Sequence, residues 1–297
     1  MQIALAYFGV VLIWSTTPLA IKWSAEDVSY VFGVTARMSL GAVCLLILML
    51  LMRQPLRLHK RAWLTYLAVA LQLYVGMLVT YWGARFIPSG WLSVIFGLTP
   101  FMTAFLAAAF LKERSLGWGK LFSYTLGVMG LVLMFHSALD INQQAIQGMI
   151  AILIAAFLQA SGAVWVKQIR AELPALTQIS GGMLISLPTY LITWYWLDHG
   201  ILPTDMSLQT QLAILYLGVI ATPIGFALYY YVLIHMSATS VALITLITPV
   251  FSLVLGWSVN HEPVTIKVAS GASLILLALA LHTLLDRRQR KQQPVQS

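Results

Sequence analysis

Charged side chains are scarce in this sequence. They make up 9 % of its 297 residues, whereas hydrophobic residues make up 60 % and the mean hydropathy is +0.86. A soluble domain carries about 25 % charged residues, because its surface faces water. The apolar runs reach about 20 residues, the length that a helix needs to cross a bilayer, and they lack the apolar–polar alternation of barrel strands. The composition therefore excludes a soluble domain and predicts an all-α integral membrane protein.

Cysteine is nearly absent, and so are the residue patterns of enzymes and metal sites. The single cysteine, Cys44, lies inside an apolar run, which excludes an intrachain disulfide and indicates a packing thiol. The sequence has no His-Glu-x-x-His motif, no acidic pair near the middle of an apolar run, and no two histidines at metal-ligand spacing on one helical face. We therefore predict no enzymatic activity, no metal and no cofactor.

The N-terminal segment has no basic residue ahead of its apolar run, which continues past Pro18. That run is too long for a signal-peptide core, so we interpret it as a retained first span. Nine further runs follow, and the short connections between them make neighbouring spans antiparallel. The predicted spans are residues 3–22, 30–52, 63–83, 89–111, 118–136, 148–168, 175–197, 211–233, 238–259 and 264–285, with loops at 137–147 and 198–210.

The 17 basic residues are distributed unevenly between the connections. Most of them fall on one side of the membrane, in the clusters 53–61, 112–120 and 287–291, and most acidic residues fall on the other side. The positive-inside rule then places both termini in the cytoplasm, in a multi-pass protein of the cell inner (plasma) membrane. Residues 286–297 are predicted as a basic cytoplasmic tail. This distribution indicates a lipid bilayer as partner and no nucleic acid.

One short pattern occurs twice. Thr99-Pro100, an apolar run and Glu113 recur at the same spacing as Thr248-Pro249, an apolar run and Glu262. Each half of the chain holds five predicted spans, and an odd number means that the second copy enters the membrane upside down. We therefore predict two inverted five-helix repeats, residues 1–140 and 145–285. Such repeats are typical of secondary transporters with alternating access.

These residues carry a resemblance to a known family. The two Thr-Pro…Glu copies with their final apolar spans (99–136 and 248–285), Arg37 in span 2, and Lys22 and Lys167 ending spans 1 and 6 resemble the drug/metabolite transporter superfamily. Within it, the chain is similar to the EamA family of ten-span exporters. The resemblance implies a secondary transporter that exports small amphipathic metabolites, such as amino acids, aromatic ones included, or related compounds. We expect a monomer or a weak dimer with a small-molecule substrate.

Residues near the middle of the spans are candidates for the substrate site. A helix rises about 1.5 Å per residue, so the midplane lies about 10–12 residues into each span, where transporter sites gather. A wall of aromatic rings and hydroxyls at that depth suits an amphipathic solute. The predicted substrate-binding residues are Trp14, Tyr74, Met77, Tyr81, Phe96, Thr99, Gln159, Trp165, Tyr230, Thr245 and Thr248. Packing is the alternative role for these side chains.

Two tyrosines and two prolines are candidate gating residues. Tyr81 and Tyr230 are equivalent in the two halves and lie at opposite depths, so we expect them at the outer and inner gates. Pro100 and Pro249 each lack a backbone N–H and can bend or break a helix.

Three charged residues are further candidates: Arg37, Glu113 and Glu262. Arg37 lies within span 2, where it could extend outward to the interface, pair with a carbonyl or bind a substrate carboxylate. Glu113 and Glu262 precede spans 5 and 10, where carboxylates suit a helix N-terminus, so we expect capping and pairing rather than proton coupling.

Two rival functions stay open within the same superfamily. A proton-coupled drug or metabolite antiporter would use a carboxylate near the midplane, and the sequence has none there. An importer of nucleotide sugars or phosphorylated metabolites calls for several central Lys or Arg residues, whereas only Arg37 lies well inside a span here, with Lys22 and Lys167 at span ends. A facilitator or exchanger of neutral or zwitterionic cargo follows most directly.

Overall fold

The computed structural model describes residues 2–111, 118–236 and 238–292, and these residues form helices and no strands. The first half contains α1 Gln2–Trp23, α2 Tyr30–Leu51, α3 Lys60–Leu71, the π-helical segment η1 Gln72–Gly76, α4 Met77–Ala84, α5 Ser89–Phe96, α6 Thr99–Leu111 and α7 Trp118–Ile141. The second half contains α8 Gln143–Ile169, α9 Ala175–Leu197, α10 Leu208–Leu215, the π-helical segment η2 Tyr216–Ile224, α11 Gly225–His235, α12 Ala238–Asn260 and α13 Ile266–Gln292.

Several of these elements join into single membrane spans. The segments α3, η1 and α4 form one span, Lys60–Ala84, and α5 and α6 form another, Ser89–Leu111. In the part of the chain that the structure describes, nine stretches are long and apolar enough to cross a membrane, and Ile244–Asn260 of α12 adds a shorter apolar helix. The predicted all-α membrane fold with ten helices is therefore confirmed.

Two segments predicted outside the helices are largely helical. The loop prediction for residues 137–147 was wrong: α7 continues to Ile141, and α8 begins at Gln143 with the Asn142 side chain accepting a hydrogen bond from the backbone N–H of Ala145 at 2.8 Å. The polar residues there are helix ends, since an Asn at the N-cap stabilises the start of α8. Likewise α13 runs to Gln292, so most of the predicted tail 286–297 continues the last helix.

The two Thr-Pro pairs act differently on their helices. In the first half, α5 ends at Phe96 and α6 begins at Thr99, so Pro100 lies in the first turn of a new helix. Proline is tolerated there because that N–H has no partner within the helix. In the second half, Pro249 lies inside α12, which continues without a break. The repeated sequence thus breaks one span and leaves its counterpart continuous.

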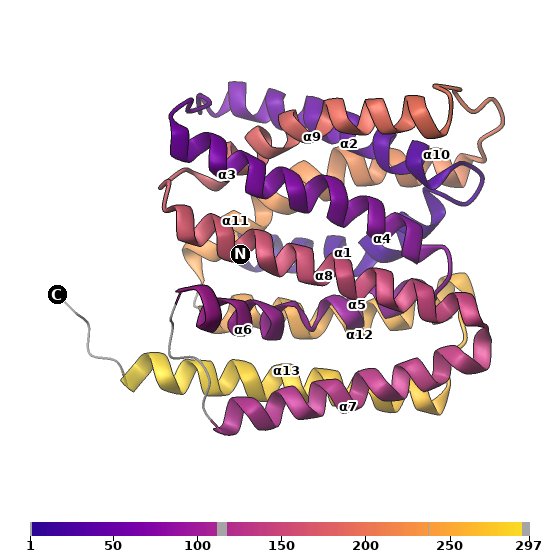
Figure 1. The fold of residues 1–297 in the computed structure, drawn as a ribbon, viewed down its shortest axis with the longest axis vertical. Helices are drawn as coiled ribbons and strands as arrows, with labels where there is room; N and C mark the ends of the chain where they lie inside the picture. Colours follow the sequence, from indigo (N-terminus) through magenta and orange to yellow (C-terminus); the bar gives the residue numbers. More distant parts are fainter. Residues whose placement is uncertain (1, 112–117, 237, 293–297) are drawn as a thin grey trace.

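The helices lie side by side in one bundle, with α2 and α9 at one edge and α7 and α13 at the opposite edge (Figure 1). We compared the contacts between spans after each span of the first half was replaced by its equivalent in the second half and vice versa (1 with 6, 2 with 7, and so on). The contact of spans 1 and 9 (α1–α12) then becomes that of spans 6 and 4 (α6–α8), and that of spans 1 and 8 (α1–α11) becomes that of spans 6 and 3 (α4–α8). The contact of spans 3 and 7 (α3–α9) becomes that of spans 8 and 2 (α2–η2). The pairs α2–α9, α5–α12 and α7–α13 convert into themselves. These pairings agree with the predicted inverted repeat, which stays a prediction.

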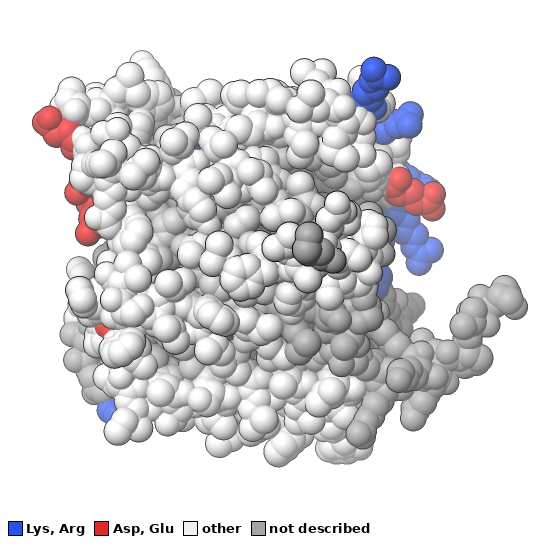
Figure 2. Space-filling model, turned by 180° about the vertical axis from the view of Figure 1, so that it is seen from behind, with Lys and Arg blue, Asp and Glu red and all other residues white. Residues whose placement is uncertain are grey.

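Charge separates along the helix direction. Figure 2 shows most of the visible Lys and Arg at one end of the bundle and most of the visible Asp and Glu at the other, with an uncharged surface between them. That middle surface exposes large apolar side chains such as Phe8, Val132 and Ile192. A broad apolar belt between two polar ends is what a bilayer requires of a multi-pass protein.

The pair α7–α13 depends on two glycines in close approach. A Cβ added at Gly130 would lie 2.5 Å from the carbonyl oxygen of Gly271, and one added at Gly271 would lie 2.7 Å from the carbonyl oxygen of Gly130. Small residues at such a crossing let the two backbones approach closely within a membrane. The two helices can therefore pack at this distance only while both positions lack a side chain.

We expect Gly130→Ala and Gly271→Ala each to destabilise the protein by about 1–3 kcal/mol, because the added methyl meets backbone that cannot move aside cheaply. Thermal unfolding in detergent measures this loss. Gly76→Ala is the matched control, since nothing lies within 4 Å of an added Cβ there, and alanine is the better helix former. Equal stability of Gly130→Ala and Gly76→Ala would contradict the close approach.

Candidate functional site

A cavity of about 100 Å³ lies between the two halves of the chain. Its walls come from α2, from η1 and α4, from α5, and from α8, α9, η2 and α11. The lining side chains mix one cation, amides, hydroxyls and large apolar groups. They are Arg37, Met38, Gln72, Leu73, Gly76, Met77, Thr80, Phe96, Ala155, Gln159, Ile179, Met183, Thr222 and Phe226.

Two π-helical segments face this cavity. The segments η1 and η2 interrupt the third and eighth spans, and η2 contains Pro223, which cannot donate a backbone hydrogen bond. In η1, the carbonyl oxygen of Leu73 accepts a hydrogen bond from the buried Tyr190 hydroxyl. In η2, the Thr222 hydroxyl donates to the carbonyl oxygen of Leu217 at 2.9 Å. π-Helical segments are rare and frequently occur at functional sites. The cavity therefore lies where both halves depart from regular helix.

Arg37 is the cation of the cavity wall. Its side chain is only 5 % exposed, so the guanidinium does not extend to the interface. Neither Nε nor Nη1 has a hydrogen-bond partner among the described residues. Burying a charge without a partner is costly, and buried cations are normally paired. The positive charge beside the cavity is therefore not balanced by any described residue of its wall.

The other polar members of the wall are uncharged. Gln72 in η1 approaches α8, because its Oε1 would lie 2.9 Å from a Cβ added at Gly162. Gln159 on α8 lines the cavity and is exposed, so the cavity meets the molecular surface there. Thr80 is buried, and its hydroxyl donates to the backbone carbonyl of Gly76 at 2.7 Å. Among the described residues that line the cavity, none is acidic.

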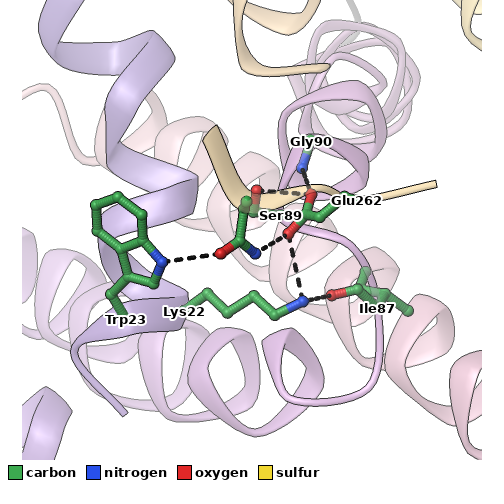
Figure 3. Close-up of polar contacts among 7 residues, drawn as sticks. Lys22, Trp23, Ile87, Ser89, Gly90 and Glu262 are labelled. Atoms are coloured by element: carbon green, nitrogen blue, oxygen red, sulfur yellow. Dashed lines mark hydrogen bonds and ion pairs between the residues drawn. The ribbon is translucent and has the colours of Figure 1, made fainter. Parts of the chain in front are cut away.

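A polar network holds one end of the bundle together (Figure 3). Glu262, which is 6 % exposed, forms an ion pair with Lys22 at 3.3 Å and accepts hydrogen bonds from Ser89 Oγ at 2.9 Å and Asn260 Nδ2 at 2.8 Å. It also accepts from the backbone N–H of Gly90 at the start of α5. The network therefore joins the end of α1, the start of α5 and the connection between α12 and α13.

Two further contacts extend this network, which we call the Lys22–Glu262 network and which comprises Lys22, Trp23, Ile87, Ser89, Gly90, Asn260 and Glu262. Trp23 Nε1 donates to Asn260 Oδ1 at 3.0 Å, and Lys22 Nζ donates to the carbonyl of Ile87 at 3.3 Å. Glu262 was expected to cap its own helix, yet α13 begins only at Ile266 and the carboxylate serves the N-terminus of α5 instead.

The Glu262 carboxyl lies in the connection between helices, and its surroundings favour the ionised form. Burial alone raises the pKa, but the donors from the Ser89–Gly90 segment, the Lys22 ammonium and the Asn260 amide outweigh it and hold the pKa below its usual value. Charge-assisted hydrogen bonds to a carboxylate act in this direction. Glu262 therefore remains ionised at neutral pH.

The structure brings four of the predicted site residues to the cavity: Arg37, Met77, Phe96 and Gln159. The others lie elsewhere in the described part of the chain. Trp14 stacks on Tyr229 with ring centroids 4.9 Å apart, Tyr74 packs edge-on against Tyr190 and bonds Thr193, and Tyr81 is fully buried with its hydroxyl accepting from Ser24. These three aromatic side chains bridge helices.

The remaining candidates divide by exposure. Trp165 is 40 % exposed on α8, Thr245 is half-buried, and Thr248 and Pro249 are buried within α12. Thr99 is half-buried at the start of α6, and its buried hydroxyl has no partner among the described residues. Tyr230 belongs to α11, but its side chain lies outside the described part, as does the whole of Glu113.

Several lining residues carried no usable signal in the sequence. Gln72 is an amide within an apolar run, as Gln159 is, and this polarity could have identified it. Thr80, Thr222, Phe226 and Met183 look like ordinary residues of membrane helices. Their position in the wall depends on how the π segments rotate the helices, and a helical spacing of 3.6 residues does not predict that rotation.

Comparisons with known proteins agree with this fold. The profile of the EamA-like transporter family matches residues 1–136 and 146–284. An uncharacterized transporter of Bacillus subtilis (strain 168), YoaV, is 24 % identical over 97 % of this chain and 99 % of its own. A probable amino-acid metabolite efflux pump of Salmonella typhimurium is 27 % identical over 66 % of this chain and 67 % of its own.

Two further matches are a transporter whose name gives its cargo and a solved structure. An S-adenosylmethionine/S-adenosylhomocysteine transporter of Chlamydia muridarum is 24 % identical over 84 % of this chain and 81 % of its own. A solved crystal structure at 18 % identity superposes with a TM-score of 0.67, over 97 % of this chain and 99 % of that chain, and so shares the fold. Because the family profile covers nearly the whole sequence, this chain belongs to the EamA-like transporter family and is a multi-pass membrane transporter.

Proposed function

We propose that this protein exports small amphipathic carboxylates, amino acids and related metabolites, across the inner membrane by alternating access, as a facilitator or exchanger. The observation that carries the proposal is the Arg37 guanidinium in the cavity wall, which is 5 % exposed and faces no acidic residue among the described lining residues. A guanidinium binds a carboxylate through two parallel hydrogen bonds. Phe96, Phe226 and the methionines of the wall would contact the apolar part of such a solute.

The relatives support the same class of cargo. Amino-acid metabolites carry a carboxylate, and two relatives bear names that refer to their efflux. The proposed orientation has both termini in the cytoplasm, with the basic end seen in Figure 2 facing inward and the Lys22–Glu262 network facing outward. The inverted repeat would then supply two equivalent halves around the cavity, which is the arrangement of alternating access.

The cavity argues against nucleotide sugars and phosphorylated metabolites. Its volume of about 100 Å³ is small beside the roughly 300–1,000 Å³ of sites for drug-sized ligands. Arg37 is the only cation among the described residues that line it, whereas phosphate groups call for several. Small solutes with one carboxylate fit both the volume and the charge.

The proposal is tested with purified protein in liposomes. We expect unlabelled amino acids and related small carboxylates inside the vesicles to drive uptake of one labelled member of the set, and the same compounds to raise the unfolding temperature. The matched amides and amines, which lack a carboxylate, serve as controls. Stabilisation and transport of nucleotide sugars, with none for small carboxylates, would replace this function by the importer.

A pH gradient is expected to leave the final accumulation unchanged. Proton coupling needs a titratable group that meets the substrate path, and no described lining residue is acidic. The buried acid Glu262 lies in the Lys22–Glu262 network and is held ionised. Liposomes with an imposed gradient of one pH unit measure this, with the membrane potential clamped at zero. Accumulation that follows the gradient would establish a proton antiporter.

A further inference from the structure

The cavity carries a positive charge that no lining residue balances. Arg37 is 5 % exposed, its Nε and Nη1 have no partner, and the other polar groups of the described wall are the amides of Gln72 and Gln159 and the hydroxyls of Thr80 and Thr222. Resting on the proposed function, we propose that the preferred substrates are monoanionic carboxylates without an ammonium group, such as 2-oxo acids and short aliphatic or aromatic acids.

Each group of a solute meets a different part of the wall. A carboxylate beside the Arg37 guanidinium neutralises its charge. The apolar remainder lies among Phe96, Phe226 and Met77. A monoanion therefore leaves the occupied cavity neutral.

An amino acid adds an ammonium group only two bonds from its carboxylate carbon. That second cation enters beside the Arg37 guanidinium, and the described wall offers amide and hydroxyl oxygens but no carboxylate to receive it. Desolvating a cation without an anionic partner is unfavourable, and like charges at close range repel. The same cavity therefore penalises a zwitterion relative to its anionic analogue.

The charge of the substrate has a consequence for direction. A facilitator that carries a monoanion alone moves one negative charge per cycle, whatever the protein's own charges do within the cycle, whereas one-for-one exchange of monoanions moves none. One elementary charge gains about 2.3 kcal/mol per 100 mV, which corresponds to an accumulation ratio of about 50-fold. A cell interior that is electrically negative thus drives the anion outward, and export needs no proton.

The first experiment compares matched solutes on the wild-type protein. The set is leucine, 4-methyl-2-oxopentanoate, 4-methylpentanoate and leucinamide, measured by thermal shift and by counterflow in liposomes. We expect the two anions to bind at least 10-fold more tightly than leucine, and leucinamide to give no shift. Leucine binding as tightly as the anions, or more tightly, overturns the inference but leaves the proposed function intact. Failure of all four, and of the wider set of small carboxylates, overturns the proposed function itself.

The second experiment imposes a potassium diffusion potential with valinomycin on liposomes that contain the protein. We expect an inside-positive potential of 100 mV to drive uptake of 4-methylpentanoate toward about 50-fold accumulation, at equal pH on both sides. The vesicles contain no carboxylate, so that exchange cannot take place, and protein-free liposomes provide the baseline for passive entry of the uncharged acid. Carboxylate uptake that is indifferent to the potential under these conditions would mean that a cation travels with it, and would overturn the inference.

Discussion

Arg37→Met is expected to reduce carboxylate transport about 100-fold or more while leaving the protein at least as stable as the wild type. Each hydrogen bond between a guanidinium and a carboxylate contributes about 1.5–3 kcal/mol, so losing two of them lowers affinity at least that far. Stability moves in the other direction, because the unliganded protein no longer buries a charge whose Nε and Nη1 lack partners. Methionine has similar length and fills the site.

The measurements are substrate affinity by thermal shift, transport in liposomes, and the unfolding temperature without substrate. Arg37→Lys keeps the charge but loses the planar fork, so we expect an intermediate affinity. Arg85→Met is the matched control: Arg85 is exposed, and its guanidinium lies 4.5 Å from the centre of the Tyr30 ring, away from the cavity. A fall of several kcal/mol in the stability of Arg37→Met alone would show that Arg37 is a structural residue and not a binding one.

The sequence predicted the membrane architecture because hydrophobic runs depend on length and composition alone. Ten spans, their antiparallel order and the family were all accessible from apolar runs and from the Thr-Pro…Glu pattern. The loop at 137–147 was predicted wrongly because polar residues at helix ends resemble those of loops. The broken fourth span and the continuous ninth share the same Thr-Pro, so the Thr-Pro pair alone does not decide whether the helix continues.

The site was predicted less well, for a related reason. Of the residues predicted for the substrate site, Met77, Phe96 and Gln159 line the cavity, but depth along a span does not tell which face of a helix looks inward. Trp14, Tyr74 and Tyr81 lie at suitable depths, yet their rings or hydroxyls bind neighbouring helices. The sequence identified Arg37 as a candidate because burying a charge within a membrane span is energetically costly, and such residues usually belong to functional sites.

Glu262→Gln is expected to open the end of the cavity that carries the Lys22–Glu262 network. The substitution removes the ion pair with Lys22 and weakens the hydrogen bonds from Ser89 and Gly90. Losing one partner of a fully buried pair costs about 3–5 kcal/mol. Lys22 is 31 % exposed and so partly screened, which reduces the expected cost to about 1–2 kcal/mol. The closed arrangement is then populated about 10-fold less relative to an open one.

Labelling of an introduced cysteine measures this opening. In a Cys44→Ala background, Thr80→Cys places a thiol in the cavity wall on α4, and the connection that follows α4 carries Ile87 of the network. We expect a membrane-impermeant maleimide, added to the side that carries the network, to react about 10-fold faster once Glu262→Gln is introduced. Glu26→Gln is the matched control. Glu26 is exposed in the connection that follows α1, so this substitution makes the same chemical change outside the network.

The pH dependence of labelling separates an ion-pair gate from a general loosening of the bundle. The pKa of Glu262 lies below its usual value in the closed arrangement, so the carboxylate stabilises closure at any pH above the usual value and loses this effect only as pH falls through the lowered one. Because maleimide reacts with the thiolate, each labelling rate is divided by that of a small free thiol at the same pH. This ratio for Thr80→Cys should be constant between pH 6 and pH 8 and rise only in acid, and the Glu262→Gln protein should lack that acid rise. If the rise persists in Glu262→Gln, another group closes this end, and the network serves packing alone.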